Sequence, residues 1–536
     1  MMNHTLVLFG ILVLMFRASS LRLATSVRSM SAMPMAATVQ QEAIQELKAP
    51  HLWQTTSFIN GEFVDGSGGE TFSVLNPATG TIIAECSRHG RSQTKEAIEA
   101  ANTAWHSKWK KTTAKERSKV IMKMFDLIHK HKDDLALIMT LESGKPLAES
   151  KGELLYAASF YELYAEEAKR ISGETMSPPL SNRRMMTIKQ PVGVAALITP
   201  WNFPAAMITR KLGPALAAGC TAVIKPSENT PLTALAMCAI AKEAGVPAGV
   251  VNCVTVGREE VKDVGETLCH SSDVRKLSFT GSTAVGKWLY RESASTMKRL
   301  SMELGGNAPF IVFDDADLDL AISCLINAKF RNTGQVCISS NRIFVQEGIY
   351  ETFSAKLVEK VQKMRVGSGL DNKVTAGPLI NVAGMEKCDR HVQDCVSKGA
   401  TVAVGGKKMD ELNKKGASFF EPTVLTGVTS EMAPYSEETF GPIASLFSFK
   451  TEEEVIAAAN DTPFGLAGYC CTSSMSRTFR MAEALEVGMV GINEGAIGSE
   501  MIPFGGVKES GIGREGGHYG IEEFLETKYI CIGNID

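Results

Sequence analysis

The segment 191–228, PVGVAALITPWNFPAAMITRKLGPALAAGCTAVIKPSE, decides the fold of this 536-residue chain. It contains two short apolar runs, at 192–198 and 222–224, separated by a helix-like stretch at about 206–218. Short apolar runs that alternate with helical patterns are typical of parallel strands joined by crossover helices. The segment therefore predicts an α/β fold built around a parallel sheet.

The same alternation continues along the chain. Further helix-like and strand-like segments follow at 230–244, 250–256, 259–269 and 274–279, and a second series occupies 309–313, 317–333, 342–346, 349–365 and 381–399. Before these, strands are predicted within 58–64 and 73–86, and helices at about 93–108, 114–148 and 151–171. Two α/β units in one chain predict two domains with a cleft between them.

The charge balance is almost even, because 56 Lys and Arg residues accompany 59 Asp and Glu residues and leave a net charge of −3. With 44% hydrophobic and 21% charged residues, the composition is that of a globular protein. A nearly neutral chain lacks the positive field that nucleic-acid binding requires, so we expect no nucleic-acid partner. The twelve cysteines include no Cys-x-x-Cys pair, which predicts free thiols and no metal site.

Residues 1–40 differ in composition from the rest of the chain. The apolar run 6–16 has eleven residues, about half of what a membrane-spanning helix needs, so no membrane span is expected. Arginines and serines follow, and the first acidic residue is Glu42. This composition predicts a targeting leader, with the mitochondrion as the first expectation. A secretory signal, a two-part signal for a plastid or another organelle, and an unprocessed tail are the alternatives.

Two turns after predicted strands contain residues suited to a dinucleotide. The turn FTGSTAVG at 279–286 opens a helix, so Gly281, Ser282 and Gly286 are expected to bind a pyrophosphate, with an ordinary capped turn as the alternative. In KPSE at 225–228, the Glu228 carboxylate can accept hydrogen bonds from ribose hydroxyls, with a surface ion pair as the alternative.

The literal G-x-G-x-x-G sequence of the chain lies at 511–516. Only twenty residues follow it, whereas this motif acquires its meaning in a βαβ unit of about 30 residues. We interpret it as a loop.

Three residues are candidates for catalysis. Cys337 follows a polar, glycine-containing loop at the expected end of a helix, as a reactive thiol requires, although a lone cysteine is more often structural. Glu303 adjoins two glycines, and Asn202 lies in a rigid turn between two prolines, from which its amide could stabilise an oxyanion. A local cap and an ordinary turn residue are the respective alternatives.

Together these motifs resemble the aldehyde dehydrogenase superfamily. The matching stretches come in the family's order and span about 57–534: PWNFP at 200–204, KPSE at 225–228, FTGST at 279–283, MELGG at 302–306, GQVC at 334–337, EETFGP at 437–442 and PFGG at 503–506. The resemblance implies NAD(P)-dependent oxidation of an aldehyde to a carboxylate. It makes Cys337 the nucleophile, Asn202 an oxyanion donor and Glu303 the base that activates water.

The resemblance also implies the residues that contact the cofactor and the substrate. The cofactor set is Trp201, Lys225, Pro226, Ser227, Glu228, Gly281, Ser282, Gly286, Glu438 and Phe440. Since a 2′-phosphate would face the Glu228 carboxylate, NAD is expected to be preferred, with NADP possible. Arg210 and Arg331 look like the pair with which succinate-semialdehyde dehydrogenases bind the distal carboxylate of their substrate. Ser499 is similar to a serine of that site, although the usual Ser-Ser pair here reads Gly498-Ser499.

The substrate implied is therefore succinate semialdehyde, an intermediate of 4-aminobutyrate degradation. Glutarate semialdehyde or a broad range of aldehydes is the alternative, and a CoA-acylating enzyme or an inactive binding protein is a further one. The resemblance implies a Rossmann-like NAD-binding domain at 41–174 and 196–305 and a catalytic domain at 306–519. A small β element at 175–195 and 520–536 is expected to form homodimers or homotetramers.

Overall fold

The computed structural model describes residues 44–66 and 68–535. The chain divides into two units, Met1–Leu47 and Lys48–Asp536, and everything below concerns the second. The leader predicted at 1–40 lies outside the described residues. Over the part of the chain that is described, no helix is both long and apolar enough to cross a membrane.

The first of the two large sheets contains the segment 191–228. Five of its strands are parallel, in the order β9 (Val251–Cys253), β8 (Thr221–Lys225), β7 (Val194–Ile198), β10 (Val274–Thr280) and β11 (Arg299–Glu303). The antiparallel edges are β2 (Glu62–Val64) with β1 (Ser57–Ile59), and β21 (Gly511–Ile512). The strand order reverses between β7 and β10, and ligands bind at such a switch point, outside the carboxyl ends of the strands.

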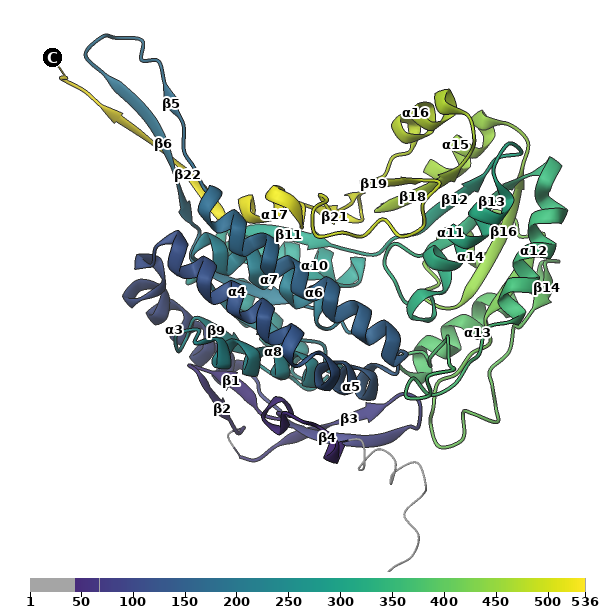
Figure 1. Ribbon diagram of the computed structural model, residues 1–536, viewed down its shortest axis with the longest axis horizontal. Helices are drawn as coiled ribbons and strands as arrows, with labels where there is room; N and C mark the ends of the chain where they lie inside the picture. The colour runs from purple at the N-terminus through teal and green to yellow at the C-terminus, as the bar shows by residue number, and fades with distance from the viewer. Residues whose placement is uncertain (1–43, 67, 536) are drawn as a thin grey trace, which may run out of the picture. The chain divides into compact units, whose positions relative to one another are not determined.

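Helices cover both faces of this sheet (Figure 1). They are α3 (Arg91–Ser107), α4 (Ala114–Lys130), α5 (Lys132–Ser143), α6 (Leu147–Glu167), α7 (Ala206–Ala218), α8 (Pro231–Ala244), α9 (Val261–His270) and α10 (Thr283–Ser293). Every residue of α7 is buried, which explains its nearly continuous apolar sequence.

Two predictions for this region were wrong in detail. The single helix expected at 114–148 is two helices, α4 and α5, because the chain leaves helical geometry at His131. α5 begins afresh with Asp133 and Asp134 in its first turn, where carboxylates are favoured, and ends at Gly144 with φ +76°. The loop expected at 511–516 contains a two-residue strand, β21, which pairs with β11.

The second large sheet confirms the second predicted series. Its strands run in the order β14 (Thr401–Val404), β15 (Thr423–Thr426), β16 (Ile443–Phe449), β13 (Ser340–Gln346), β12 (Ala308–Val312), β18 (Ala467–Cys471) and β19 (Met489–Ile492), all parallel except β14. Its helices are α11 (Leu318–Phe330), α12 (Tyr350–Gln362), α13 (Val382–Ser397), α14 (Ala433–Ser436), α15 (Glu452–Asn460) and α16 (Met475–Ala484).

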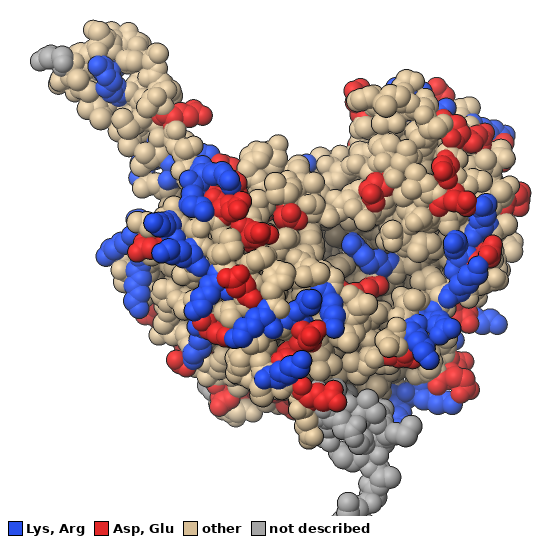
Figure 2. Space-filling view, viewed as in Figure 1, with Lys and Arg blue, Asp and Glu red and all other residues tan. Residues whose placement is uncertain are grey.

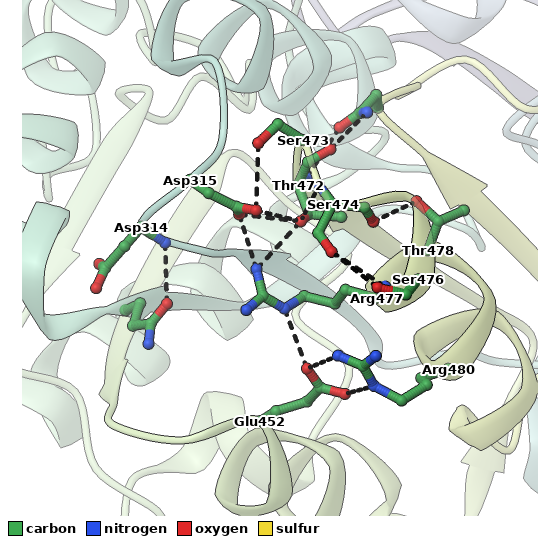
Figure 3. Close-up of polar contacts among 12 residues, drawn as sticks. Asp314, Asp315, Glu452, Thr472, Ser473, Ser474, Ser476, Arg477, Thr478 and Arg480 are labelled. Atoms are coloured by element: carbon green, nitrogen blue, oxygen red, sulfur yellow. Dashed lines mark hydrogen bonds and ion pairs between the residues drawn. The ribbon is translucent and has the colours of Figure 1, made fainter.

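A polar network ties α15 and α16 to the turn after β12 (Figure 3). The Arg477 guanidinium lies between two carboxylates, 2.9 Å from Asp315 Oδ1 and 3.0 Å from Glu452 Oε2, and Arg480 donates to the same Glu452. The Arg477 guanidinium also lies 4.2 Å from the centroid of the Phe313 ring. This edge of the sheet is therefore held by several charge-assisted hydrogen bonds rather than by one surface pair.

The smaller elements complete the structure. A hairpin joins β3 (Thr71–Asn76) to β4 (Thr81–Ser87), and a three-stranded sheet is formed by β5 (Thr175–Met176), β6 (Arg184–Pro191) and β22 (Leu525–Ile532). Figure 1 shows this last sheet projecting from the helices beside it. The remaining short elements are β17 (Phe464–Gly465), β20 (Val507–Lys508) and α17 (Gly517–Glu522). In the face shown in Figure 2, acidic and basic side chains are intermixed.

Candidate active site

Cys337 lies in a loop that separates two cavities. The loop joins the short 3₁₀ turn η5 (Arg331–Gly334) to β13, at the carboxyl end of α11. Cys337 lines one cavity of about 340 Å³ together with residues that follow β7 and β10. It also lines a second cavity, of about 310 Å³, which contains Arg210 and Arg331. One thiol is therefore accessible from two separate binding spaces.

The backbone before this thiol is held in an unusual conformation. Asn332, Thr333 and Gly334 all have positive φ, at +49°, +56° and +74°. A side chain at Gly334 would collide with the Gly441 carbonyl, since an added Cβ would lie 2.1 Å from its oxygen. Gln335 fixes the loop, because its side chain donates to the Asn332 carbonyl at 3.1 Å and accepts from Ile380 N–H at 2.9 Å. Strain of this kind is concentrated at functional sites.

Asn202 is attached to the same loop. Its Nδ2 donates to the Gln335 carbonyl at 3.0 Å, and its own carbonyl accepts from Asn332 Nδ2 at 3.0 Å and from Lys145 Nζ at 2.7 Å. An amide nitrogen has two N–H groups, so one remains to donate into the cavity that Asn202 and Cys337 both line. The structure thus brings the predicted oxyanion donor and the predicted nucleophile together.

A buried ion pair supports Asn202, and sequence reasoning missed it. Lys145 and Glu153 are both almost fully buried and form a short ion pair. Glu153 Oε1 also accepts from the backbone N–H groups of Ala205 and Ala206, at 2.9 and 3.2 Å. The pair therefore fixes the chain on both sides of the turn that contains Asn202. Because Lys145 lies 57 residues from Asn202, no local pattern could have revealed this contact.

Glu303 ends β11 in a buried and highly charged setting. Neither of its carboxyl oxygens has a hydrogen-bond partner among the described residues. Its pKa is raised well above the usual range, first by burial and then by the nearby Glu515. Glu515 itself is paired with Arg210, at 3.0 Å, and with Lys211. In this geometry the protonated form of Glu303 is favoured, and the residue does not line either of the two cavities.

The surroundings of Cys337 also favour its neutral form. Its side chain is exposed to the two cavities rather than to open solvent, and burial raises the pKa of the thiol to about 12. The positive charge of Arg210 acts against this shift, while Glu438 and Glu303 add to it. Since the thiolate is the nucleophile, attack on a carbonyl requires removal of this proton.

The larger cavity holds five of the ten predicted cofactor residues. They are Trp201, Gly281, Ser282, Glu438 and Phe440. Glu438 accepts from Gly306 N–H at 2.9 Å, and burial raises its pKa to about 7. Phe440 has φ +55°, and its ring meets the Trp201 ring edge to face at 5.4 Å. Aromatic walls, a glycine turn and a carboxylate are the features that a nicotinamide nucleoside needs.

The other five predicted cofactor residues do not line this cavity. Ser282 caps α10, so the free N–H groups of this helix start beside the cavity. Gly286 packs against Leu304, because an added Cβ would lie 2.3 Å from that side chain. Glu228 lines a third cavity that shares Asn381 with the larger one. Lys225 is the last residue of β8, and Pro226 and Ser227 follow it.

Two cations flank Glu228. Lys225 Nζ lies 3.8 Å from one carboxylate oxygen, and Arg258 Nη1 lies 3.7 Å from the other. Burial lowers the pKa of Lys225, and Glu228 partly compensates. Arg258 was missed by sequence reasoning, because it follows β9 whereas Glu228 follows β8.

The smaller cavity holds both predicted arginines but not Ser499. Arg331 is exposed, and its guanidinium lies 5.4 Å from the centroid of the Phe203 ring. Arg210 is almost fully buried and paired with Glu515, yet its Nη2 has no hydrogen-bond partner within the described chain. Gly498 lines the cavity instead of Ser499, whose hydroxyl bonds to Glu500 and to Met501 N–H. These local contacts turn the serine away from the position predicted for it.

Known proteins resemble the chain over nearly its whole length. A succinate-semialdehyde dehydrogenase of rice mitochondria is 53% identical, with 92% of each chain covered. An NADP⁺-dependent succinate-semialdehyde dehydrogenase of Escherichia coli is 52% identical and covers 91% of this chain and all of its own. A glutarate-semialdehyde dehydrogenase of Pseudomonas putida is 54% identical, with 91% of this chain and 99% of its own covered.

A solved structure and a family match extend this result. The crystal structure of betaine aldehyde dehydrogenase from Staphylococcus aureus in complex with NAD⁺ has a TM-score of 0.88 at 36% identity, and the match covers 93% of this chain and 98% of that one. Residues 63–530 match the aldehyde dehydrogenase family, a range that includes Asn202, Glu303, Cys337 and both cavities. The chain is thus a member of the aldehyde dehydrogenase family.

Proposed function

We propose that this enzyme oxidises succinate semialdehyde to succinate with NAD⁺ or NADP⁺ as hydride acceptor. The observation that carries the proposal is the place of Cys337 between two cavities, one with cofactor-type walls and one with two guanidinium groups. Succinate semialdehyde has an aldehyde at one end and a carboxylate at the other. It matches a space with a nucleophile at one end and cations at the other.

The larger cavity suits a nicotinamide dinucleotide. The turn requires glycine at Gly281, because an added Cβ would lie 2.5 Å from the Phe279 ring. The N-terminus of α10 favours the pyrophosphate, and Glu438 can accept hydrogen bonds from a ribose. The dinucleotide, when bound, supplies the acceptor for a hydride. Trp201 and Phe440 would hold it against the thiol.

The Cys337 thiol first loses its proton to solvent in the cavity, and the thiolate Sγ then forms a bond to the aldehyde carbon. As this bond forms, the carbonyl oxygen becomes an oxyanion, which the free N–H of Asn202 and the backbone N–H of Cys337 can stabilise. Lys145 and Glu153 act as positioning residues, because Lys145 donates to the Asn202 carbonyl and Glu153 accepts from Ala205 N–H in the same turn. Departure of a hydride from the resulting thiohemiacetal leaves a thioester on Cys337.

Hydrolysis of that thioester requires a base, and we assign this role to Glu303. In the described geometry its protonated form is favoured and it lies against the Arg210–Glu515 cluster. Its carboxyl group makes no hydrogen bond to a described residue, so a rotation of the side chain toward Cys337 would break none. Once ionised, it can take a proton from water as the water attacks the thioester.

The substrate carboxylate is expected to lie between Arg331 and the free Nη2 of Arg210. Arg331 enters no ion pair with any residue that the structure describes, so its charge is available to a ligand. The same two arginines would also bind the carboxylate of glutarate semialdehyde, which is longer by one methylene. Because the Pseudomonas putida relative is a glutarate-semialdehyde dehydrogenase, this aldehyde is the alternative substrate.

Replacing Arg331 tests the substrate assignment. In Arg331→Ala, kcat/KM for succinate semialdehyde should fall about 10- to 100-fold, because a charge-assisted hydrogen bond contributes about 1.5–3 kcal/mol. The kcat/KM for butanal, in which a methyl group replaces the carboxylate, should change less than about threefold. Steady-state kinetics on both aldehydes provides the measurement. Arg331→Lys is the second variant, because it keeps the positive charge but loses the paired hydrogen-bond donors of the guanidinium group. An equal loss of kcat/KM for both aldehydes would refute the proposed binding of the substrate carboxylate by Arg331. A wild-type kcat/KM that is higher for glutarate semialdehyde than for succinate semialdehyde would favour the alternative substrate.

Cofactor choice depends on the charge around Glu228. A 2′-phosphate would be repelled by this carboxylate, whereas Lys225 and Arg258 weaken the repulsion, so we propose a preference for NAD⁺ that is incomplete.

In Glu228→Gln, the ratio of kcat/KM for NADP⁺ to that for NAD⁺ should rise about tenfold, because one unfavourable charge contact is removed. Glu259→Gln, at a neighbouring and mostly exposed carboxylate, should leave the ratio unchanged. A wild-type enzyme that already prefers NADP⁺, or an unchanged ratio in Glu228→Gln, would disprove this role.

Two further proposals concern location and assembly. We infer that 1–40 is a mitochondrial leader, with a plastid or another organelle as the alternative; the rice relative is a mitochondrial enzyme. We also infer that the sheet β5–β6–β22 joins subunits into a homodimer or homotetramer, because Tyr529 and Ile532 of β22 are exposed apolar residues. N-terminal sequencing of the native enzyme tests the leader, and a chain that retains Met1 would refute it. Light scattering tests the assembly, and a monomer would refute it.

A further inference from the structure

Two histidines and a glutamate meet far from the predicted catalytic residues. His51 lies in the 3₁₀ turn η1 (Pro50–Leu52), His131 between α4 and α5, and Glu243 near the end of α8. One ligand atom from each lies within 4.8 Å of the other two. Across the described residues this is the one group of three or more His, Cys, Asp or Glu side chains that converge in this way. Because its members are separated by 80 and 112 residues, the spacing of cysteines and histidines in the sequence could not reveal it.

Both imidazoles approach the same carboxylate oxygen. His51 Nε2 lies 3.1 Å and His131 Nε2 lies 3.2 Å from Glu243 Oε2. The two rings are nearly perpendicular, at 82°, with centroids 5.5 Å apart, so their nitrogens point toward a common place from different directions. Lys130 Nζ contacts the other carboxylate oxygen, Oε1, at 3.0 Å. The oxygen that faces both histidines is therefore not the one that the lysine uses.

We propose that His51, His131 and Glu243 bind a divalent transition-metal ion, with Zn²⁺ as the best match. Two imidazole nitrogens and a carboxylate oxygen are a set of three protein ligands that Zn²⁺ accepts, with water in the fourth position. Mg²⁺ and Ca²⁺, which prefer oxygen ligands only, fit this set poorly. Atoms bonded to one tetrahedral ion at about 2.0–2.2 Å lie about 3.3–3.6 Å apart, so the two separations between the imidazole nitrogens and Glu243, 3.1 and 3.2 Å, already suit an ion. The two imidazole nitrogens lie within 4.8 Å of each other, and His51, whose side chain is half exposed, can adjust this separation.

The expected role of the ion is structural. Its ligands come from the start of the second unit, from the α4–α5 corner and from α8, so one bound ion would fasten η1 to two helices. A ligand that binds only the folded state stabilises it in proportion to its affinity and concentration. The proposal is independent of the oxidation chemistry, since none of the three residues lines either cavity at Cys337. Loss of the metal site and loss of the proposed activity are therefore separable results.

Lys130 gives the proposal a specific electrostatic consequence. Its ammonium group shares Glu243 with the proposed ion and therefore repels it. Removing the charge in Lys130→Met should tighten binding of the cation, whereas removing a ligand should weaken it. Opposite effects of two adjacent substitutions, at 130 and 131, are not expected from a general change in stability.

Zn²⁺ binding to the full chain tests the proposal directly. The titration uses competition with a chromophoric chelator, in a Cys337→Ser and Cys531→Ser background that removes the two thiols that are not buried. The background protein should bind one equivalent of Zn²⁺. The Zn²⁺ affinity should fall more than about tenfold, about 1.4 kcal/mol, in His51→Ala and in His131→Ala. Lys130→Met should bind the equivalent more tightly, and Zn²⁺ should raise the thermal unfolding midpoint only in proteins that retain all three ligands.

His270→Ala is the matched control. His270 is as exposed as His51 and contacts Glu292 at the same 3.1 Å, but it has no second histidine beside it. Its substitution should leave the bound equivalent intact. His51→Ala keeps the experiment decisive if His131→Ala does not fold, because His51 lies on a short exposed turn. Zn²⁺ affinity that is unchanged in His51→Ala, or reduced equally in His270→Ala, would overturn the proposal.

Discussion

The hydrogen bond from Asn202 Nδ2 to the Gln335 carbonyl, 3.0 Å long, joins the regions of the two large sheets beside Cys337. Asn202 follows β7 in the middle of the first sheet, and Gln335 precedes β13 in the second. Through this bond the predicted oxyanion donor and the loop of Cys337 are placed together. Lys145, Glu153 and Asn332 then fix the bond from behind, with buried charges and hydrogen bonds that leave little freedom of movement.

Burial determines the electrostatics around Cys337. It raises the pKa of the thiol to about 12 and raises the pKa of Glu303 well above its usual range, so the uncharged form of each group is favoured in this geometry. Arg210 and Lys211 share the single carboxylate of Glu515, so one positive charge remains beside the thiol and Glu303. A change that brings a cation or a base to the thiol would therefore have a large effect on the pKa of Cys337, because interactions between charges are strong where water is excluded.

Much of the fold followed from local pattern, and most of the site did not follow from pattern alone. The alternation of apolar runs and helical segments predicted β7, β8, β10 and their crossover helices, because buried parallel strands have short continuous apolar sequences. It missed β11, whose sequence RLSME is not continuously apolar. It joined α4 to α5 because no proline or glycine marks the break between them at His131. Motif resemblance identified Cys337, Asn202 and Glu303. Lys145, Arg258 and the His51–His131–Glu243 group were missed because each depends on contacts between distant parts of the chain.

In the proposed mechanism, Cys337 carries the acyl group as a thioester, and Glu303 activates the water that hydrolyses it. The most direct measurement is rapid-mixing kinetics of Glu303→Gln with succinate semialdehyde and NAD⁺, followed by mass spectrometry of the protein. We expect a burst of about one NADH per active site, then slow turnover, with a succinyl group on Cys337. Cys337→Ser should show no burst. Turnover of Glu303→Gln at the wild-type rate, or the absence of both burst and acyl adduct, would contradict the account.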